Sequence, residues 1–238
     1  MRLSMRATYG TSFAAVEGLA RTFLCLLALS MMAGLVPTPA AAQAAVGATQ
    51  PIKLVVLGDS LSAGYLLPGP AAFPVRLQKA LKDKGIATEI INAGVSGDTT
   101  SGGLGRLDWS VPDGTQGVIL ELGANDALRG TDPKVPRAAL TEIIQRLQAR
   151  KIAVLLCGML APPNYGADYA NNFNSIFPDL AKQFAVPLYP FFLDGVVGNP
   201  VLQLSDGMHP TAEGVDVMVA KILPSVEAFL GTLAKQPS

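Results

Sequence analysis

Histidine is nearly absent from this chain. Its 238 residues include one histidine, His209, one tryptophan, Trp109, and two cysteines. A structural or catalytic zinc site usually takes most of its ligands from histidine and cysteine, so this inventory excludes the usual zinc site. The glycine-rich stretch 102–106 lacks both the Gly-Lys-Ser/Thr ending of a P-loop and the spacing of a dinucleotide fingerprint. We therefore expect no metal and no nucleotide cofactor, and we predict that residues 102–106 form a flexible loop.

The first 44 residues have the order of a secretory signal peptide. Three arginines precede an apolar run over residues 22–36, and a segment rich in proline and alanine follows it. Cleavage is expected after Ala42 or Ala44. The apolar run is shorter than the ~20 residues that a bilayer-spanning helix requires, so residues 1–44 predict export rather than a permanent anchor. The mature protein is expected to be periplasmic or secreted, with no stable membrane span.

Residues 45–238 are predicted to form a single domain. Removing residues 1–44 takes away three of the 18 basic residues and one of the 18 acidic residues, which leaves 15 basic and 17 acidic residues. This near-neutral balance gives no footprint for nucleic acid or for an anionic membrane surface. Only Cys157 remains after cleavage, so no intrachain disulfide is expected. The sequence does not indicate an oligomeric state.

Short apolar runs alternate with amphipathic segments along the mature chain. The apolar runs are rich in β-branched residues and lack a polar face, which is typical of strands buried in a parallel sheet. The pattern predicts an α/β fold, a three-layer α/β/α sandwich around a flavodoxin-like five-stranded parallel sheet. The expected strands cover residues 52–57, 89–93, 117–122, 152–157 and 186–189, and the clearest helices cover 73–84, 136–150 and a final segment from Thr211. Pro178 is expected to break a helical pattern over residues 173–184, and Pro224 to bend the last helix.

Polar or small residues follow three of these strands. Ser60 comes just after the first strand, Gly94 ends the second, and Asn125 follows the third. In an open parallel sheet, ligands bind beyond the carboxyl ends of the strands, near the point where the strand order reverses. We therefore expect the three residues to share one edge of the sheet.

The single histidine fits the role of a base for Ser60. A serine nucleophile needs a base within hydrogen-bond reach, and Asp206, three residues before His209, could hold the imidazole. The amide of Asn125 and the backbone N–H groups of Gly94 and Ser60 could hold an oxyanion. Each residue taken singly also has a structural explanation: His209 as a loop or capping residue, Asp206 and Asn125 as turn residues, and Gly94 as a strand end.

Four short blocks resemble those of the SGNH hydrolases, also called the GDSL family. The resemblance is closest to its bacterial thioesterase I, lysophospholipase and arylesterase branch, and it implies a flavodoxin-like sandwich. It also implies Ser60, Asp206 and His209 as the catalytic residues, with Ser60, Gly94 and Asn125 as oxyanion donors. The third block departs from the usual Gly-Gly-Asn-Asp at Ala124, which puts substrate range in doubt more than catalysis. The blocks are 58–62, 92–99, 123–126 and 206–210, and residues 161–166 add a further similarity.

The predicted activity is hydrolysis of a small-molecule ester through an acyl-enzyme, without metal or cofactor. Apolar residues in loops that should surround Ser60 suggest a groove for an acyl or aryl group, although they could equally pack onto the core. The candidates for substrate contact are Leu128, Leu160, Ala161 and Pro162, with Leu66, Leu67 and Met159 nearby in the same loops. Thioesters and lysophospholipids also fit. Two alternatives stay open: a polysaccharide O-acetyl esterase, for which Trp109 is the only tryptophan platform, and a non-catalytic envelope binding protein.

Overall fold

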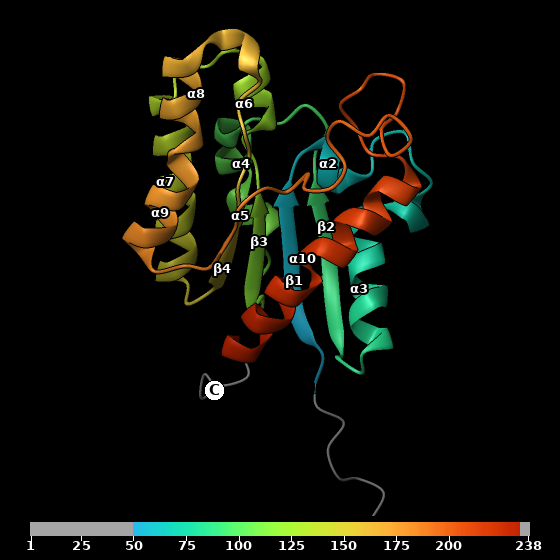
Figure 1. Ribbon diagram of the computed structural model, residues 1–238. Helices are drawn as coiled ribbons and strands as arrows, with labels where there is room; N and C mark the ends of the chain where they lie inside the picture. Colours follow the sequence, from blue (N-terminus) through green and yellow to red (C-terminus); the bar gives the residue numbers. More distant parts are fainter. Residues whose placement is uncertain (1–49, 234–238) are drawn as a thin grey trace, which may run out of the picture. The chain divides into compact units, whose positions relative to one another are not determined.

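Five parallel strands form the centre of the molecule (Figure 1). The computed structural model describes residues 50–233, so the predicted signal peptide lies outside the described residues. The sheet order is β2-β1-β3-β4-β5, which confirms the predicted flavodoxin-like topology. The strands are β1 (Ile52–Gly58), β2 (Thr88–Gly94), β3 (Gly117–Glu121), β4 (Ala153–Cys157) and β5 (Leu188–Tyr189).

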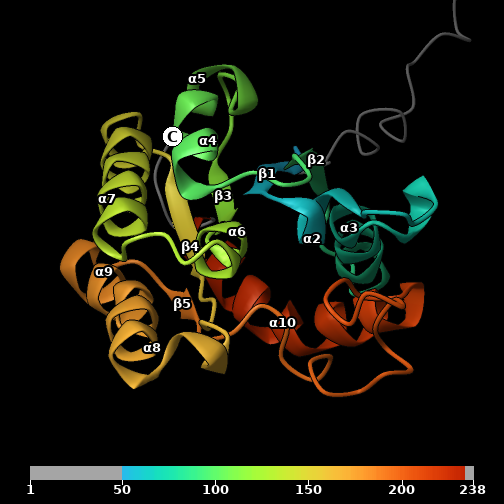
Figure 2. The same cartoon turned by 90° about the horizontal axis from the view of Figure 1, so that it is seen from above.

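Helices cover both faces of the sheet (Figure 2). On one face α3 (Phe73–Asp83) packs against α10 (Ala212–Leu233). The other face carries α4 (Thr100–Gly105), α5 (Leu107–Ser110), α7 (Lys134–Ala149) and α9 (Ile176–Phe184). The remaining short elements lie in the connections: α2 (Ser60–Ala63), η2 (Gly69–Ala71), α6 (Ala124–Leu128), η3 (Pro163–Tyr165) and α8 (Ala167–Asn174). No helix within residues 50–233 combines the length and the hydropathy that crossing a bilayer requires.

The core lies between the central strands and these helices. Every residue of β3 is buried, as are the last five residues of β1, as expected for strands covered on both faces. The edge strand β2 differs from this expectation because only β1 pairs with it, and its Ile91 is 38% exposed. Removing apolar strand surface from water on both faces holds the central strands in register. Their carboxyl ends are therefore fixed relative to one another.

The prediction of a flexible loop at residues 102–106 is wrong, because most of this stretch forms α4. The Thr99 hydroxyl caps the helix by accepting the Gly102 N–H at 3.1 Å. A Cβ atom on Gly102 would lie 1.9 Å from Oδ1 of Asp98. Gly102 therefore leaves room for a neighbouring carboxylate, and the stretch is glycine-rich for close packing rather than for flexibility.

The predicted break in the helical pattern over residues 173–184 and the predicted cap of the last helix are both present. The predicted helix break occurs at Ser175, between α8 and α9, which places Pro178 in the first turn of α9, where a missing N–H is tolerated. Thr211 caps α10 by accepting the Gly214 N–H at 3.2 Å. The helix α10 continues through Pro224, and the bend expected there stays a prediction.

Two carboxyl groups are buried where β1 and β3 end side by side. The Asp59 N–H donates to Oε2 of Glu121 at 3.3 Å, and the Ser62 hydroxyl donates to the same oxygen at 2.5 Å. Burial raises the pKa of Asp59 to about 6, and hydrogen bonds from Leu61 and Asn125 limit the rise. Burial also raises the pKa of Glu121 well above its usual range, and the neighbouring Asp59 charge adds to that shift. The carboxyl edge of the sheet therefore contains an ionisable pair that resists full ionisation.

The Asp59→Asn variant tests this buried pair through the pH dependence of stability. Because the pKa of Asp59 in the folded state is about 6 rather than 3.8, the folded state holds a proton that the unfolded state releases first. The wild-type free energy of unfolding should therefore fall as pH rises from about 4 to about 6. In Asp59→Asn this fall should be smaller by roughly 1–3 kcal/mol, as measured by urea unfolding across that range. The exposed Asp83→Asn on α3 is the control, and an unchanged pH slope in Asp59→Asn would contradict the burial argument.

Candidate active site

Ser60 is the first residue of α2, immediately beyond the end of β1. Asp59 caps this helix, and its Oδ1 accepts the Leu61 N–H at 2.9 Å. Ser60 is 8% exposed, and its Oγ lies 2.9 Å from Nε2 of His209. The structure thus brings together a hydroxyl and an imidazole that are 149 residues apart in the chain.

Asp206 lies on the other side of the imidazole. Its Oδ2 is 2.7 Å from Nδ1 of His209, while its Oδ1 accepts the backbone N–H groups of Met208 and His209 at 2.9 Å and 3.0 Å. These contacts, above all the His209 N–H, lower the pKa of Asp206 to about 2. An ionised carboxylate can only accept hydrogen bonds, so in the neutral ring the proton resides on Nδ1 and Nε2 faces Ser60 as an acceptor. The turn explanation and the histidine contact both hold for Asp206, one through each oxygen.

The ring of Tyr65 packs against this histidine, with ring centroids 4.4 Å apart. Tyr65 follows α2, so the same segment that supplies Ser60 also covers one side of His209. The sequence does not indicate a role for this residue, because no periodicity or motif distinguishes it. The contact restricts the rotation of the imidazole between Ser60 and Asp206.

Gly94 lies at the end of β2, where the backbone of α2 approaches closely. A Cβ atom at this position would lie 2.4 Å from the Ala63 nitrogen and 2.8 Å from the Asp59 carbonyl oxygen, so only glycine fits. The Gly94 N–H donates to Oδ1 of Asn92 at 3.0 Å. The predicted oxyanion donor is therefore held beside α2, and its N–H already has a partner on its own strand.

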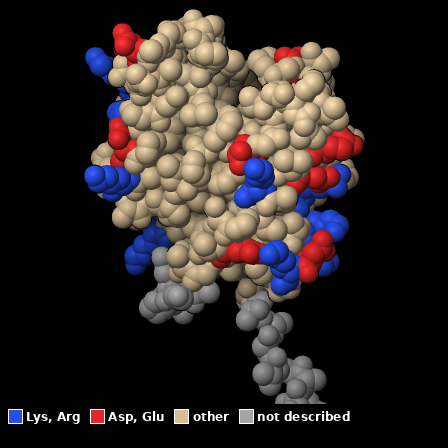
Figure 3. Space-filling model, in the orientation of Figure 1, with Lys and Arg blue, Asp and Glu red and all other residues tan. Residues whose placement is uncertain are grey.

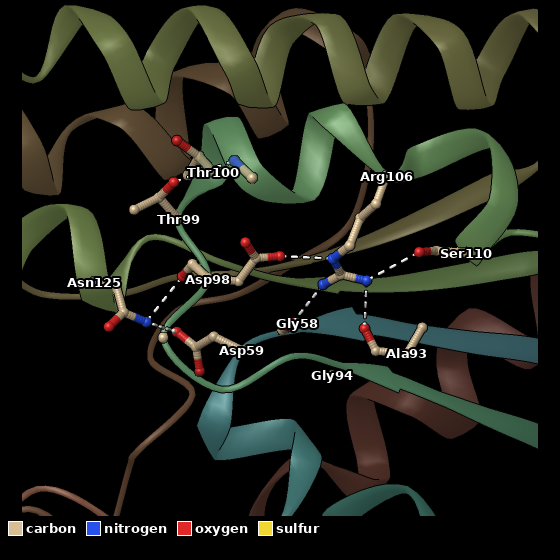
Figure 4. Close-up of polar contacts among 12 residues, drawn as sticks. Gly58, Asp59, Ala93, Gly94, Asp98, Thr99, Thr100, Arg106, Ser110 and Asn125 are labelled. Carbon is tan, nitrogen blue, oxygen red and sulfur yellow. Dashed lines mark hydrogen bonds and ion pairs between the residues drawn. The ribbon is translucent and has the colours of Figure 1, made fainter.

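Asn125 lies in the first turn of α6, after β3. Its Nδ2 donates to Oδ2 of Asp59 at 3.1 Å and to the backbone carbonyl of Asp98 at 2.9 Å, as Figure 4 shows. Both hydrogens of the amide are thus engaged with acceptors of the protein itself. To serve a substrate oxygen, Asn125 must exchange or share one of these hydrogen bonds.

A cavity of about 480 Å³ opens beside Ser60 and His209. The four predicted contact residues all line it, together with Met159. Leu66 and Leu67 do not, because Leu66 is 75% exposed and Leu67 packs against the core. A second wall of the cavity comes from the segment between β5 and α10. The sequence does not predict it, because no pattern distinguishes the residues of this segment that line the cavity from the other loop residues. That wall consists of Phe191, Leu193, Val197, Gln203, Gly207 and Met208.

The lining is mostly apolar, and charged residues lie elsewhere. None of the residues that line the cavity is Asp, Glu, Lys or Arg. On the face shown in Figure 3, basic and acidic side chains are interspersed, so neither sign dominates it. Within residues 50–233, no cluster of three or more His, Cys, Asp or Glu side chains is arranged to hold a metal ion. The geometry therefore fits a ligand with an apolar part and a reactive centre near Ser60.

Several characterised proteins are similar to this chain over most of its length. An arylesterase from Vibrio mimicus is 43% identical over 162 residues, which cover 68% of this chain and 81% of that protein. The thioesterase 1/protease 1/lysophospholipase L1 of Escherichia coli K12 is 39% identical over 178 residues, covering 73% of this chain and 84% of the relative.

Solved structures show the same relationship. The crystal structure of TesA superposes with a TM-score of 0.70 at 36% identity, covering 74% of this chain and 98% of that one. AlinE4, an SGNH-hydrolase family esterase, superposes with a TM-score of 0.65 at 44% identity, covering 77% of this chain and 99% of that one. The profile of the GDSL-like lipase/acylhydrolase family matches residues 56–217. This chain therefore belongs to the GDSL-like lipase/acylhydrolase family and is a hydrolase with the SGNH fold.

Proposed function

We propose that the protein is an exported serine esterase that hydrolyses esters with an apolar acyl or aryl group through an acyl-enzyme. The single observation that supports this most is the contact of the His209 imidazole with both Ser60 Oγ and the Asp206 carboxylate, at the mouth of an apolar cavity. A serine with a base in contact and an oriented third residue is the arrangement that nucleophilic catalysis requires. A non-catalytic binding protein would not require this contact.

The reaction proceeds in two steps. Nε2 of His209 takes the Ser60 proton as Oγ attacks the ester carbonyl, and it then gives that proton to the departing alcohol. Water then attacks the acyl-enzyme while Nε2 of His209 takes its proton, and Nε2 returns that proton to Ser60 Oγ as the acid leaves. The charged Asp206 carboxylate stabilises the imidazolium that forms in each step, and Tyr65 keeps the ring in line. No proton acceptor other than His209 and no metal enters this sequence.

The developing oxyanion is assigned to the N–H groups of Ser60 and Gly94 and to the Asn125 amide. Donors aimed at the position where charge develops stabilise the transition state more than the bound ester. Gly94 and Asn125 both have protein acceptors in this structure, so attack must be accompanied by exchange of those hydrogen bonds. An oxyanion accepts a stronger hydrogen bond than a neutral amide or carbonyl oxygen, which favours the exchange at the transition state.

The cavity supports an apolar acyl or aryl group as the recognised part of the substrate. Its lining offers little polar area beyond the catalytic residues and Gln203, and the similar proteins are named for arylesterase, thioesterase and lysophospholipase activities. A polysaccharide acetyl esterase fits less well, because Trp109 is 73% exposed on α5 and does not line the cavity. Export follows from the signal-like order of residues 1–44 and would place the enzyme in a periplasm or outside the cell.

Replacing the nucleophile tests the proposal most directly. Ser60→Ala should reduce hydrolysis of p-nitrophenyl esters by roughly 10⁴- to 10⁶-fold, because Ser60 Oγ is the hydroxyl in contact with Nε2 of His209, while leaving the unfolding curve unchanged. The control is Ser101→Ala, an exposed serine on α4. A fluorophosphonate probe should label the wild type and Ser101→Ala but not Ser60→Ala. The related esterase EstA from Pseudoalteromonas, 31% identical, has been crystallised inhibited by monoethylphosphonate. Turnover retained in Ser60→Ala would rule out the assignment.

Removing the charge behind the imidazole should slow the reaction without unfolding the protein. Asp206→Asn presents an amide to Nδ1 and favours the wrong tautomer, so kcat/KM should fall by roughly 10²- to 10⁴-fold. Because the pKa of Asp206 is about 2, the carboxylate stays charged at any practical assay pH, and the loss should appear across the whole profile. Asp194→Asn, an exposed partner of Lys221, serves as the control. Equal rates for the two variants would show that Asp206 only shapes its turn.

Filling the cavity should change the chain-length preference. In the wild type, kcat/KM should rise from p-nitrophenyl acetate to longer acyl esters by up to roughly fourfold per buried methylene. Ala161→Phe places a ring in the cavity and should remove this rise while preserving acetate hydrolysis. Val75→Phe, at a 47% exposed position on α3, is the control for the added volume. A steep wild-type preference for acetate would count against the apolar groove.

A further inference from the structure

Arg106 is a buried cation that the proposed mechanism does not use. It follows α4 at the end of the glycine-rich stretch, and it is only 6% exposed. Four of the five guanidinium hydrogens have acceptors: Nε donates to Asp98, Nη1 to the Ala93 carbonyl and to the Ser110 hydroxyl, and Nη2 to the Gly58 carbonyl (Figure 4). A charge desolvated to this extent needs a specific reason to remain in a fold.

Two of these acceptors are the carbonyls that lead into the predicted oxyanion donors. The Gly58 carbonyl, 2.8 Å from Nη2, belongs to the last residue of β1, two residues before Ser60. The Ala93 carbonyl, 2.7 Å from Nη1, belongs to the same peptide group as the Gly94 N–H. A hydrogen bond to the carbonyl of a peptide polarises its N–H and fixes the plane in which that N–H points. Arg106 therefore acts on the Gly94 donor through one shared amide.

The third donor is connected through Asp98. Its carboxylate oxygen Oδ2 lies 2.6 Å from Nε of Arg106, with both side chains largely buried, and its backbone carbonyl accepts the Asn125 amide at 2.9 Å. Gly102 keeps the space that the Asp98 carboxylate occupies, because a Cβ atom there would lie 1.9 Å from Oδ1. The glycine-rich stretch thus presents Arg106 and Asp98 to each other.

We propose that Arg106 is a positioning residue for the oxyanion hole: its guanidinium holds the peptide groups that lead to Ser60 and Gly94 and, through Asp98, the carbonyl that aims Asn125. This inference depends on the proposed function, because it concerns the same reaction. This role depends on the planar shape of the guanidinium group. Lysine would keep the positive charge, but its ammonium group cannot reach both carbonyls and Asp98 with the geometry of a fork.

The test compares Arg106→Lys with Asp98→Asn and with a matched control, in the purified chain. In both variants kcat for a p-nitrophenyl ester should fall by about 10- to 100-fold, less than the loss of a whole oxyanion donor, while KM stays within about twofold. The control is Arg150→Lys, since Arg150 also donates to a backbone carbonyl, that of Val111 at 2.7 Å, and pairs with Asp113. Its kcat should remain at the wild-type value. The number of active sites is counted by fluorophosphonate labelling at completion, so that misfolded protein does not lower the apparent kcat.

A double variant separates positioning from general support of the fold. If Arg106 acts through Asn125, Arg106→Lys should lower kcat by a much smaller factor in an Asn125→Ala background than in the wild type, because both changes weaken the same hydrogen-bond donor. Losses that simply multiply would overturn the link from Arg106 to Asn125 through Asp98, and a kcat for Arg106→Lys equal to that of Arg150→Lys would overturn the proposal. If neither Arg106→Lys nor Asp98→Asn folds, as judged by circular dichroism and labelling, Arg106 serves stability and the proposal is rejected.

The two proposals fail in different ways. Absence of ester hydrolysis by the wild type, or activity that survives in Ser60→Ala, overturns the proposed function itself. An active wild type that depends on Ser60 and Asn125, combined with an indifferent Arg106→Lys, overturns only the role of Arg106.

Discussion

The contact between Ser60 Oγ and Nε2 of His209 is the interaction on which the site depends. The serine is fixed by the end of β1, whereas the histidine lies in a long connection after β5 that has little regular structure. Local hydrogen bonds stiffen that connection: the Leu204 N–H reaches the His209 carbonyl at 2.7 Å, and Thr211 is tied to Leu202 at 2.9 Å before α10 begins. His209 is therefore held by a loop that its own hydrogen bonds stiffen, and the sheet alone could not place it.

Two buried carboxyl groups at the same edge of the sheet cost free energy of folding. Asp59 and Glu121 are buried together where β1 and β3 end, and burial disfavours their charged forms. Asp59 nevertheless accepts a hydrogen bond from the Asn125 amide and caps α2. Its position therefore stabilises both Asn125 and the helix that begins at Ser60. Local conflict of this kind is expected at a functional site, where the geometry of reacting groups outweighs the optimum of stability.

The sequence predicted the sheet order and the meeting of residues far apart in the chain because both follow from simple regularities. Buried parallel strands lack a polar face, their carboxyl ends share one edge, and a single histidine leaves one choice of base. The predictions from sequence failed where the role of a residue depends on what it packs against in the folded chain. The glycines at 102–106 suggested flexibility, yet Gly102 makes room for Asp98 and the stretch is helical. Tyr65, Phe191 and Val197 carry no pattern, because only the folded connections bring Tyr65 against His209 and the other two residues to the wall of the cavity.

The hydrogen bonds of Asn125 link the buried Asp59 to Asp98 and, through Asp98, to Arg106. An amide has two donor hydrogens, and here the carboxylate of Asp59 and the carbonyl of Asp98 take both. A donor held in this way costs little to orient but must give up a partner to stabilise an oxyanion. Arg106 holds the Asp98 carboxylate at 2.6 Å, so the backbone carbonyl of Asp98 is the better fixed of the two acceptors and keeps the amide oriented.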